Sequence, residues 1–226
     1  TCPNCKATVP DLFLPIKSGG NKVMKILIAC EFSGIVRDAF ATKGHDAWSC
    51  DLLPTERPGQ HIQDDVLNHL DEDWDMMIAH PPCTYLTVSR NKYYKPEYDS
   101  RFPTQHDDRK KAIIFFLKLA NVNIRKIAIE NPVGIMSTRW RKPDQYIHPY
   151  FFGDAERKAT GLWLINLPKL IPINIVKPLL YIYKDGRTDG MWHVKTMQLR
   201  GEERMKERSR TFQGIANAMA DQWNFD

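Results

Sequence analysis

Two apolar runs in this sequence end in groups that could do chemistry together. The run 76–79 is followed by two prolines and Cys83, and the run 126–130 ends in Glu130. We predict that both runs are buried parallel strands, because ligands in open α/β sheets bind at the carboxyl ends of such strands. A thiol and a carboxyl group at neighbouring strand ends could act as nucleophile and proton donor. A lone cysteine is more often a buried structural thiol, but the matching position of Glu130 favours catalysis.

The elements that must position these residues alternate between strand and helix. Helical spacing of apolar residues predicts helices before Gly44, over 105–122 and after Thr211, which we expect to cap the C-terminal helix, with a helical turn or two around 66–70. The polar and aromatic stretch 84–104 is typical of a functional loop. The apolar runs that predict strands are 25–30, 46–50, 61–63, 76–79, 126–130 and 160–165. This alternation predicts an α/β fold: a Rossmann-like, three-layer α/β/α domain with a mostly parallel sheet.

The composition fits one globular domain. Of 226 residues, 42% are hydrophobic and 26% charged, which excludes a disordered chain. No apolar run approaches the roughly 20 residues of a membrane helix and no signal peptide opens the sequence, so we expect no membrane contact. Five cysteines, without the density of a disulfide scaffold, favour a reducing cytoplasm. The net charge of +5 is weak evidence for a polyanionic partner.

The first residues differ from the rest and predict an N-terminal extension over 1–23. Cys2 and Cys5 have the Cys-x-x-Cys spacing of half a zinc site. A structural zinc site needs four ligands, and the sequence offers no second such pair, so we predict no metal site. A glycine-containing joint at 18–21 separates the extension from the main domain, which we place at 24–226.

A nucleoside cofactor is the simplest explanation of the first strand–turn–helix unit. The turn around Ser33 and Gly34 would place backbone amides of a helix N-terminus beside a ligand. Asp51 closes the next strand, where an acidic residue typically binds a ribose hydroxyl, and Asp65 follows the third strand. Each aspartate has a structural alternative, a strand-end cap for Asp51 and a helix N-cap for Asp65. The absence of a Gly-x-Gly-x-x-Gly loop favours S-adenosylmethionine over a nicotinamide nucleotide.

The order of these segments resembles the cytosine-5 DNA methyltransferase family over about residues 24–226. The family's Phe-x-Gly-x-Gly turn is resembled by residues 31–34, its Gly-Asp-Ile element by residues 64–66, and its Gly-Asn-Ser/Ala-Val helix by residues 216–219. Its Pro-Pro-Cys loop corresponds to residues 81–83, and its Glu-Asn strand end to Glu130 and Asn131. The Pro-Pro-Cys and Glu-Asn pair is the most specific part of the resemblance.

The resemblance implies covalent chemistry on a cytosine of DNA. Cys83 would add to carbon 6 of the ring, because carbon 5 alone is a poor nucleophile. Glu130 would donate or share a proton at ring nitrogen 3, a role that a raised pKa would suit. S-adenosylmethionine would supply the methyl group, and a duplex substrate would require base flipping. Arg157 is a candidate for supporting the base.

The resemblance also implies binding residues. The cations and aromatic rings of the loop after the nucleophile would meet phosphates and bases, although a solvated loop is the alternative. The expected nucleic-acid contacts are Arg90, Lys92, Tyr93, Lys95, Arg139 and Arg141. The expected cofactor contacts are Glu31, Phe32, Ser33, Gly34, Asp51, Leu52, Asp65, Pro81 and Asn217.

Several positions depart from the family. His80 stands where a glycine usually precedes Pro-Pro-Cys, and Pro132 where valine usually follows Glu-Asn. The recognition insert, about 166–205, is short. This predicts a compact, phage-like enzyme of a bacterial or phage-infected cell that has relaxed specificity, acts on single strands or needs a protein partner. The alternatives are the same chemistry on a pyrimidine of RNA or of a free nucleotide, and a catalytically silent nucleic-acid-binding relative.

Overall fold

The computed structural model describes residues 22–224, so the Cys2 and Cys5 pair lies outside the described residues. A seven-stranded sheet has the order β3-β2-β1-β4-β5-β7-β6. Its strands are β1 (Lys25–Ala29), β2 (Asp46–Asp51), β3 (His61–Gln63), β4 (Met76–Ala79), β5 (Lys126–Pro132), β6 (Gln145–Ile147) and β7 (Thr160–Ile165). Strands β1 to β5 pair in parallel, whereas β7 runs antiparallel to both β5 and β6. The predicted Rossmann-like, mostly parallel sheet is confirmed.

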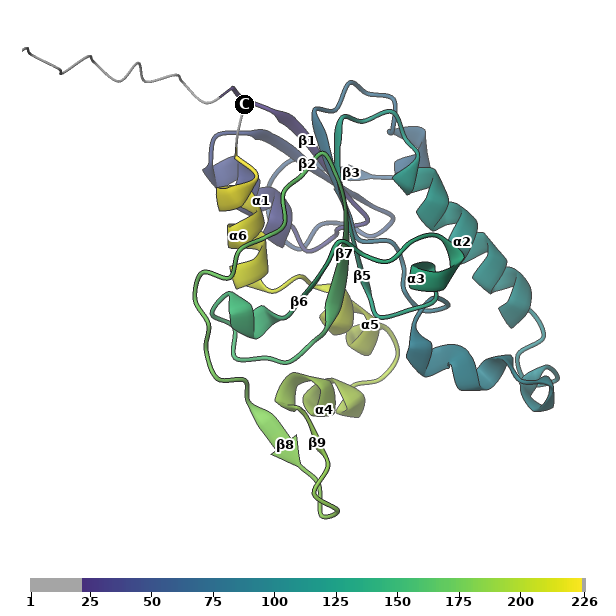
Figure 1. Cartoon of the computed structure of the whole chain (residues 1–226). Helices are drawn as coiled ribbons and strands as arrows, with labels where there is room; N and C mark the ends of the chain where they lie inside the picture. The colour runs from purple at the N-terminus through teal and green to yellow at the C-terminus, as the bar shows by residue number, and fades with distance from the viewer. Residues whose placement is uncertain (1–21, 225–226) are drawn as a thin grey trace, which may run out of the picture.

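Helices cover both faces of this sheet and make the three layers (Figure 1). Helices α1 and α6 lie on one face and α2 on the other, as the figure shows. The helices are α1 (Ile35–Thr42), α2 (Gln105–Ala120), α3 (Met136–Arg139), α4 (Met191–Gln198), α5 (Gly201–Ser209) and α6 (Gln213–Gln222). Short 3-10 helices are η1 (Val66–Asn68), η2 (Val88–Tyr94), η3 (Pro96–Tyr98) and η4 (Pro149–Phe151). None of the helices in residues 22–224 is long and apolar enough to cross a membrane.

The order in which strands are added to the sheet reverses between β1 and β4, and this switch point sets the position of the site. From β1 the chain builds outward through β2 and β3, and it then returns to place β4 on the other side of β1. Loops that leave β1 and β4 therefore diverge at the carboxyl edge and open a crevice between them, the usual ligand site of such sheets. Every residue of β4 is buried, because both faces of this central strand are covered by helices.

The predicted start of the C-terminal helix is wrong, because a contact with a distant residue engages the predicted cap. Helix α6 begins at Gln213 and its N-cap position is Phe212, with no side-chain cap, so Thr211 does not cap the helix as predicted. Its hydroxyl instead lies 3.5 Å from the Glu130 carboxylate. The helical turn predicted around 66–70 is confirmed as η1. Strand β6, helices α4 and α5, and the hairpin β8 (Leu180–Ile182) and β9 (Thr188–Gly190) had no clear sequence pattern.

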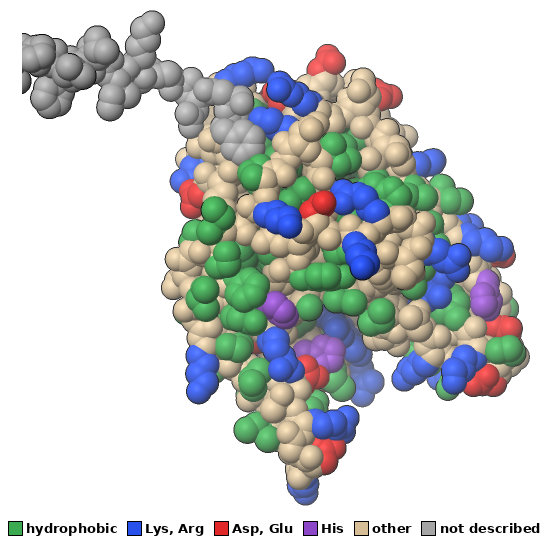
Figure 2. All heavy atoms as spheres, in the orientation of Figure 1, with side chains coloured by type: hydrophobic (Ala, Val, Ile, Leu, Met, Phe, Trp, Pro, Cys, Tyr) green, Lys and Arg blue, Asp and Glu red, His purple; other side chains and the backbone are tan. Residues whose placement is uncertain are grey.

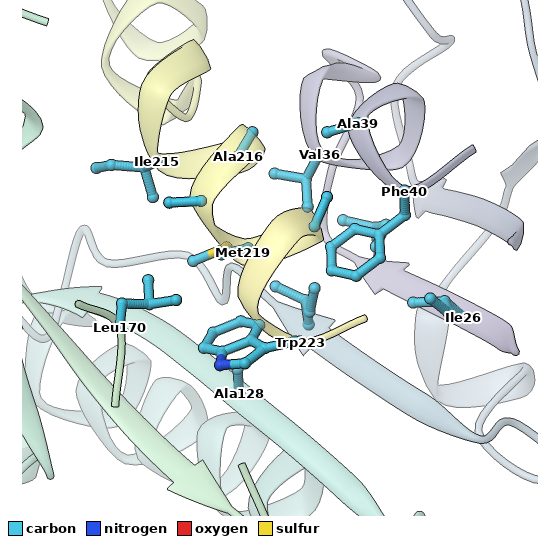
Figure 3. Packing of buried hydrophobic residues seen from close by; sticks show 14 of the residues in the cluster. Ile26, Val36, Ala39, Phe40, Ala128, Leu170, Ile215, Ala216, Met219 and Trp223 are labelled. Carbon is cyan, nitrogen blue, oxygen red and sulfur yellow. The ribbon is translucent and has the colours of Figure 1, made fainter. Parts of the chain in front are cut away.

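A hydrophobic core layer holds α1 and α6 on one face of the sheet. Val36 and Phe40 of α1 meet Met219 and Trp223 of α6 over one face of the sheet (Figure 3). Trp223 is fully buried, and its indole Nε1 donates to the Pro168 carbonyl at 3.0 Å. The C-terminal helix is therefore part of the main core.

Trp223→Ala should lower the free energy of unfolding by about 3–5 kcal/mol, because it leaves a large cavity and an unpaired Pro168 carbonyl. Urea denaturation followed by circular dichroism measures this loss. Ile114→Ala on α2, whose side chain is 56% exposed, is the control and should change stability little. An equal loss in the two variants would mean that α6 does not belong to the core.

Candidate active site

The register between β4 and β5 brings His80 and Glu130 together. Ala79 pairs with Ile129, so the next residues of the two strands lie side by side. The His80 imidazole Nδ1 is 2.8 Å from the Glu130 Oε2, and the two side chains are only 9% and 11% exposed. The predicted meeting of the two strand ends is therefore present, with a histidine at its centre.

The charges of this pair differ from the prediction for Glu130. Burial alone would raise the pKa of Glu130, but the hydrogen bond and charge of His80, with the charge of Lys158 and the Thr211 hydroxyl, lower it to about 2. Burial lowers the pKa of His80, but Glu130 outweighs burial and the net shift is upward. The raised pKa that would suit a proton donor is therefore absent from the free protein, which holds a buried ion pair.

Cys83 ends the Pro-Pro loop after β4, which hydrogen bonds hold in place. The Asn131 amide donates to the Pro81 carbonyl at 2.8 Å and ties this loop to β5. The amides of Leu86 and Thr87 both donate to the Cys83 carbonyl, at 2.9 and 3.1 Å. Burial raises the pKa of the Cys83 thiol, although the charges of Lys158 and Arg208 oppose this shift. The thiol is therefore protonated near neutral pH and needs a proton acceptor before it can attack.

The loops that follow the two strand ends are joined to each other. The Val88 amide donates to the Val133 carbonyl at 3.2 Å, and the Ile135 amide to the Leu86 carbonyl at 2.8 Å. Gly134 allows this approach, because a Cβ atom there would lie 2.3 Å from the Leu86 carbonyl oxygen. The loop that carries Cys83 is thereby fixed against the loop that follows Glu130.

Cys83 opens into a cavity of about 650 Å³ whose walls are rich in cations. Trp192 and His193 of α4 and Met205 of α5 also line it. Its cationic lining residues are Arg90, Arg157, Lys158, Arg204 and Arg208. In Figure 2, Lys and Arg side chains lie on both sides of the notch between the β8–β9 hairpin and the segment that carries η2. The cavity suits an anionic ligand with a flat apolar part.

Lys158, rather than Arg157, is the cation that acts on the reactive groups. The Arg157 guanidinium donates to the Thr188 carbonyl at 2.8 Å, whereas the charge of Lys158 lowers the pKa of both Glu130 and Cys83. Both residues line the Cys83 cavity and are adjacent in the sequence. The sequence offered no signal to choose between them.

Glu31 fills the anion site at the start of α1. Its carboxylate is 4% exposed and accepts from the amides of Val36 and Arg37, at 2.8 and 3.2 Å, and from the Ser33 hydroxyl at 3.1 Å. Gly34 provides the turn with a φ of 71°. A buried carboxylate at a helix N-terminus repels phosphate, so this turn suits a ligand without a pyrophosphate.

The other expected cofactor residues are spread over several places. Asp51 accepts from the Leu53 amide at 2.9 Å, and Asp65 from the Leu67 amide at 3.0 Å, so both structural alternatives occur. Burial raises the pKa of Asp51. Phe32 and Pro81 are buried and Leu52 is 72% exposed. Asn217 is exposed and lines a separate hollow between α1 and α6, so the structure does not bring it to the Cys83 cavity.

Only one of the expected nucleic-acid residues lines the cavity. Arg90 does so, with its guanidinium over the Tyr85 ring at 4.8 Å. Tyr93 packs edge-on against Tyr98 and Phe102, at 5.3 and 5.4 Å, so its ring is already engaged within its loop. Lys92, Lys95 and Arg139 are exposed outside the cavity. Arg141 is bound to Asp144 at 2.6 Å and donates to the Leu164 carbonyl, which are structural contacts.

The buried pair should make stability depend on pH. The Glu130 pKa lies below its usual 4.5, so this contribution is complete above 4.5 and is lost as the pH falls toward about 2. The His80 pKa lies above 6.5, so its contribution is complete below 6.5 and is lost as the pH rises through the raised value. His80→Asn should therefore cost about 3–5 kcal/mol of unfolding free energy near pH 6, and less near pH 3.5.

Urea denaturation at the two pH values measures this difference. His106→Asn is the control, because His106 pairs with Asp99 at the surface, where both side chains are 52% exposed. A loss for His80→Asn that is the same at both pH values would contradict a buried ion pair.

Comparisons with known proteins find similar solved structures but no sequence match. Neither the protein-family comparison nor the search of curated proteins finds a match. A similar solved structure is the crystal structure of a "putative DNA modification methyltransferase encoded within prophage" from E. coli. The likeness has a TM-score of 0.42 at 14% identity and covers 68% of this chain and 52% of that one. The chain thus spans about half the length of that protein.

Proposed function

We propose that this chain is an S-adenosylmethionine-dependent DNA methyltransferase that acts on carbon 5 of cytosine through a covalent Cys83 adduct. One observation carries the proposal. Cys83 and Glu130 lie at the carboxyl ends of adjacent central strands, and Cys83 opens into a cavity lined by cations. A nucleophile in a cation-lined cavity, with a carboxylate at the end of the adjacent strand, fits this chemistry better than a purely structural thiol.

The chain's own residues would perform the steps as follows. The Cys83 thiol gives up its proton and its sulfur bonds to carbon 6 of the ring. Ring nitrogen 3 takes a proton through Glu130, which neutralises the charge that the addition builds up. S-adenosylmethionine, when bound, supplies an electrophilic methyl group to carbon 5. Loss of the carbon 5 proton and of the Cys83 sulfur then restores the aromatic ring and the free enzyme.

The residues around the first turn fit this cofactor. Glu31 occupies the helix N-terminus with a buried carboxylate, so a cofactor without phosphates is favoured. Asp51 and Asp65, at the ends of the two following strands, would accept hydroxyl protons of a ribose. A sulfonium cation is also compatible with three carboxylates nearby. Asn217 has no part in this assignment, because it faces a different hollow.

The cavity cations favour a nucleic acid as the substrate. Arg204 and Arg208 come from α5, and Arg90 comes from η2 on the other side of the cavity. A polynucleotide bound between them would place phosphates on both walls and one unstacked base against Cys83. The region 166–205, with the β8–β9 hairpin and α4, would serve as a small recognition insert. Its size favours few base contacts and leaves room for a protein partner.

Covalent trapping tests the reaction. Protein, S-adenosylmethionine and DNA containing 5-fluorocytosine should give a denaturation-resistant adduct, because fluorine cannot leave carbon 5 as a proton does. Gel shift and peptide mass spectrometry should locate the adduct at Cys83, and Cys83→Ser should abolish it. Cys50→Ser is the matched control, since its buried thiol contacts the Asp64 carbonyl at 3.5 Å, a contact that a hydroxyl can also make.

Two results would overturn the proposal. The first is methyl transfer by Cys83→Ser at the parent rate. The second is trapping on 5-fluoropyrimidine RNA or mononucleotide alone, which would move the substrate class away from DNA.

Cofactor binding gives a separate test. Asp51→Ala should weaken S-adenosylmethionine binding by about 1–3 kcal/mol, the value of a lost charge-assisted hydrogen bond, measured by calorimetry. Asp107→Ala on the exposed start of α2, where Asp107 pairs with Lys110, is the control. Unchanged affinity in both Asp51→Ala and Asp65→Ala would remove these residues from the cofactor site.

A further inference from the structure

His80 has one more hydrogen-bonding nitrogen than it needs to hold the Glu130 carboxylate in place. Only Nδ1 of His80 is engaged, at 2.8 Å from Glu130. The second ring nitrogen, Nε2, is buried and has no hydrogen-bond partner among residues 22–224. A buried histidine placed only to orient its neighbour would normally have both nitrogens satisfied.

The groups that face the pair decide which partner holds the proton. Glu130 and, at longer range, Glu31 favour the protonated imidazole, whereas burial and Lys158 oppose it. Glu130 is held in its ionised form by His80, Lys158 and the Thr211 hydroxyl. Cys83, on the loop after His80, interacts electrostatically with Glu130 and Lys158. In the free protein the pair therefore carries one proton, and that proton is on His80.

An ionised Glu130 is the wrong partner for cytosine. Ring nitrogen 3 and a carboxylate are both acceptors, so they cannot hydrogen-bond without a proton between them. Beside His80, the pKa of Glu130 is lowered to about 2, so near neutral pH the carboxylate has no proton of its own to give. Some other group has to provide it, and His80 is in direct contact with the carboxylate.

We propose that His80 is a positioning residue that stores the proton which Glu130 delivers to ring nitrogen 3 of the substrate base. The inference rests on the proposed function, because it names the proton source for that reaction. His80 occupies the place of a family glycine, so this chain carries a proton store that the family motif does not supply.

The proton balance closes over one turnover. As the base docks, the Nδ1 proton of His80 moves to Glu130 and a proton passes from Glu130 to nitrogen 3, which leaves a neutral imidazole beside a carboxylate and a cationic ring. The Cys83 thiol loses its proton to solvent, and its sulfur bonds to carbon 6. Once carbon 5 carries its methyl group, its proton passes to solvent, and the Cys83 sulfur leaves as a thiolate that takes up a proton from solvent. The nitrogen 3 proton then returns through Glu130 to His80. Each group ends in its starting state.

The coupling of the two side chains can be tested without substrate. Titration of the imidazole resonances by NMR should give His80 a pKa above 6.5 in the parent. In Glu130→Gln, which keeps the size and an acceptor oxygen but removes the charge, the His80 pKa should fall below that of the parent. His69, whose pKa is raised by its hydrogen bond to Glu72, is the internal control and should titrate identically in both proteins. The same His80 pKa in both would overturn the proposal, whatever the enzyme's activity.

The role in the reaction is tested by the pH dependence of trapping on 5-fluorocytosine DNA. Without His80 the transferable proton resides on Glu130 alone, so the inflection that belongs to the pair should move to lower pH in His80→Asn. The rate near pH 8 should fall by about 10²-fold, the lower range for a lost proton-transfer group. The higher inflection, from the Cys83 thiol, should not move. A uniform loss of rate with an unmoved profile would show a purely structural role and overturn the proposal.

The NMR titration and the trapping experiment distinguish a failure of the proposed function from a failure of the role proposed for His80. A parent protein that forms no adduct on any strand form or at any pH would overturn the proposed function, and with it the role of the stored proton in the reaction. If His80→Asn does not fold, the NMR comparison of the parent with Glu130→Gln still decides the coupling, because it needs neither substrate nor the His80 variant.

Discussion

The hydrogen-bonded register between β4 and β5 is the constraint on which the site depends. One pairing, Ala79 with Ile129, places His80 beside Glu130 and sets the loop that carries Cys83 next to them. A shift of one residue along either strand would turn one of the two side chains to the other face of the sheet, so the apolar residues that fix the register also fix the chemistry. Helices on both faces bury these strands and hold that register.

Burial of the His80–Glu130 pair carries a desolvation cost that each charge can offset only in the presence of the other. Two charged groups that are about nine-tenths buried are stable only together, since either one alone would face a large desolvation cost. The same burial raises the pKa of the Cys83 thiol and leaves it protonated. In the free protein, protons are therefore held on the His80 imidazole and on the Cys83 thiol. The charge of Lys158, which also lines the cavity, acts to lower the pKa of both Glu130 and Cys83.

The sequence was sufficient for the strands that are long and continuously apolar, which is why β1, β4 and β5 and their polar ends were predicted. It was insufficient where a side chain has a distant partner. Thr211 has the residue type of a helix cap, but its hydroxyl contacts Glu130, 81 positions away. The low pKa of Glu130 depends on His80, which in the sequence was only a departure from a motif. The sequence could not show whether Arg157 or Lys158 acts on the reactive groups, because the two are adjacent cations and their different contacts appear only in the fold.

The backbone bonds between the loops after β4 and β5 have a mechanical consequence. The Leu86 carbonyl and the Val133 carbonyl each accept an amide proton from the opposite loop, across the side-chain-free Gly134. Neither loop can then open by itself without breaking these bonds, so thermal fluctuations displace the thiol and carboxylate segments as one cooperative unit. The separation of the Cys83 thiol from the Glu130 carboxylate is thus less sensitive to movements of α4 and α5, which also line the cavity.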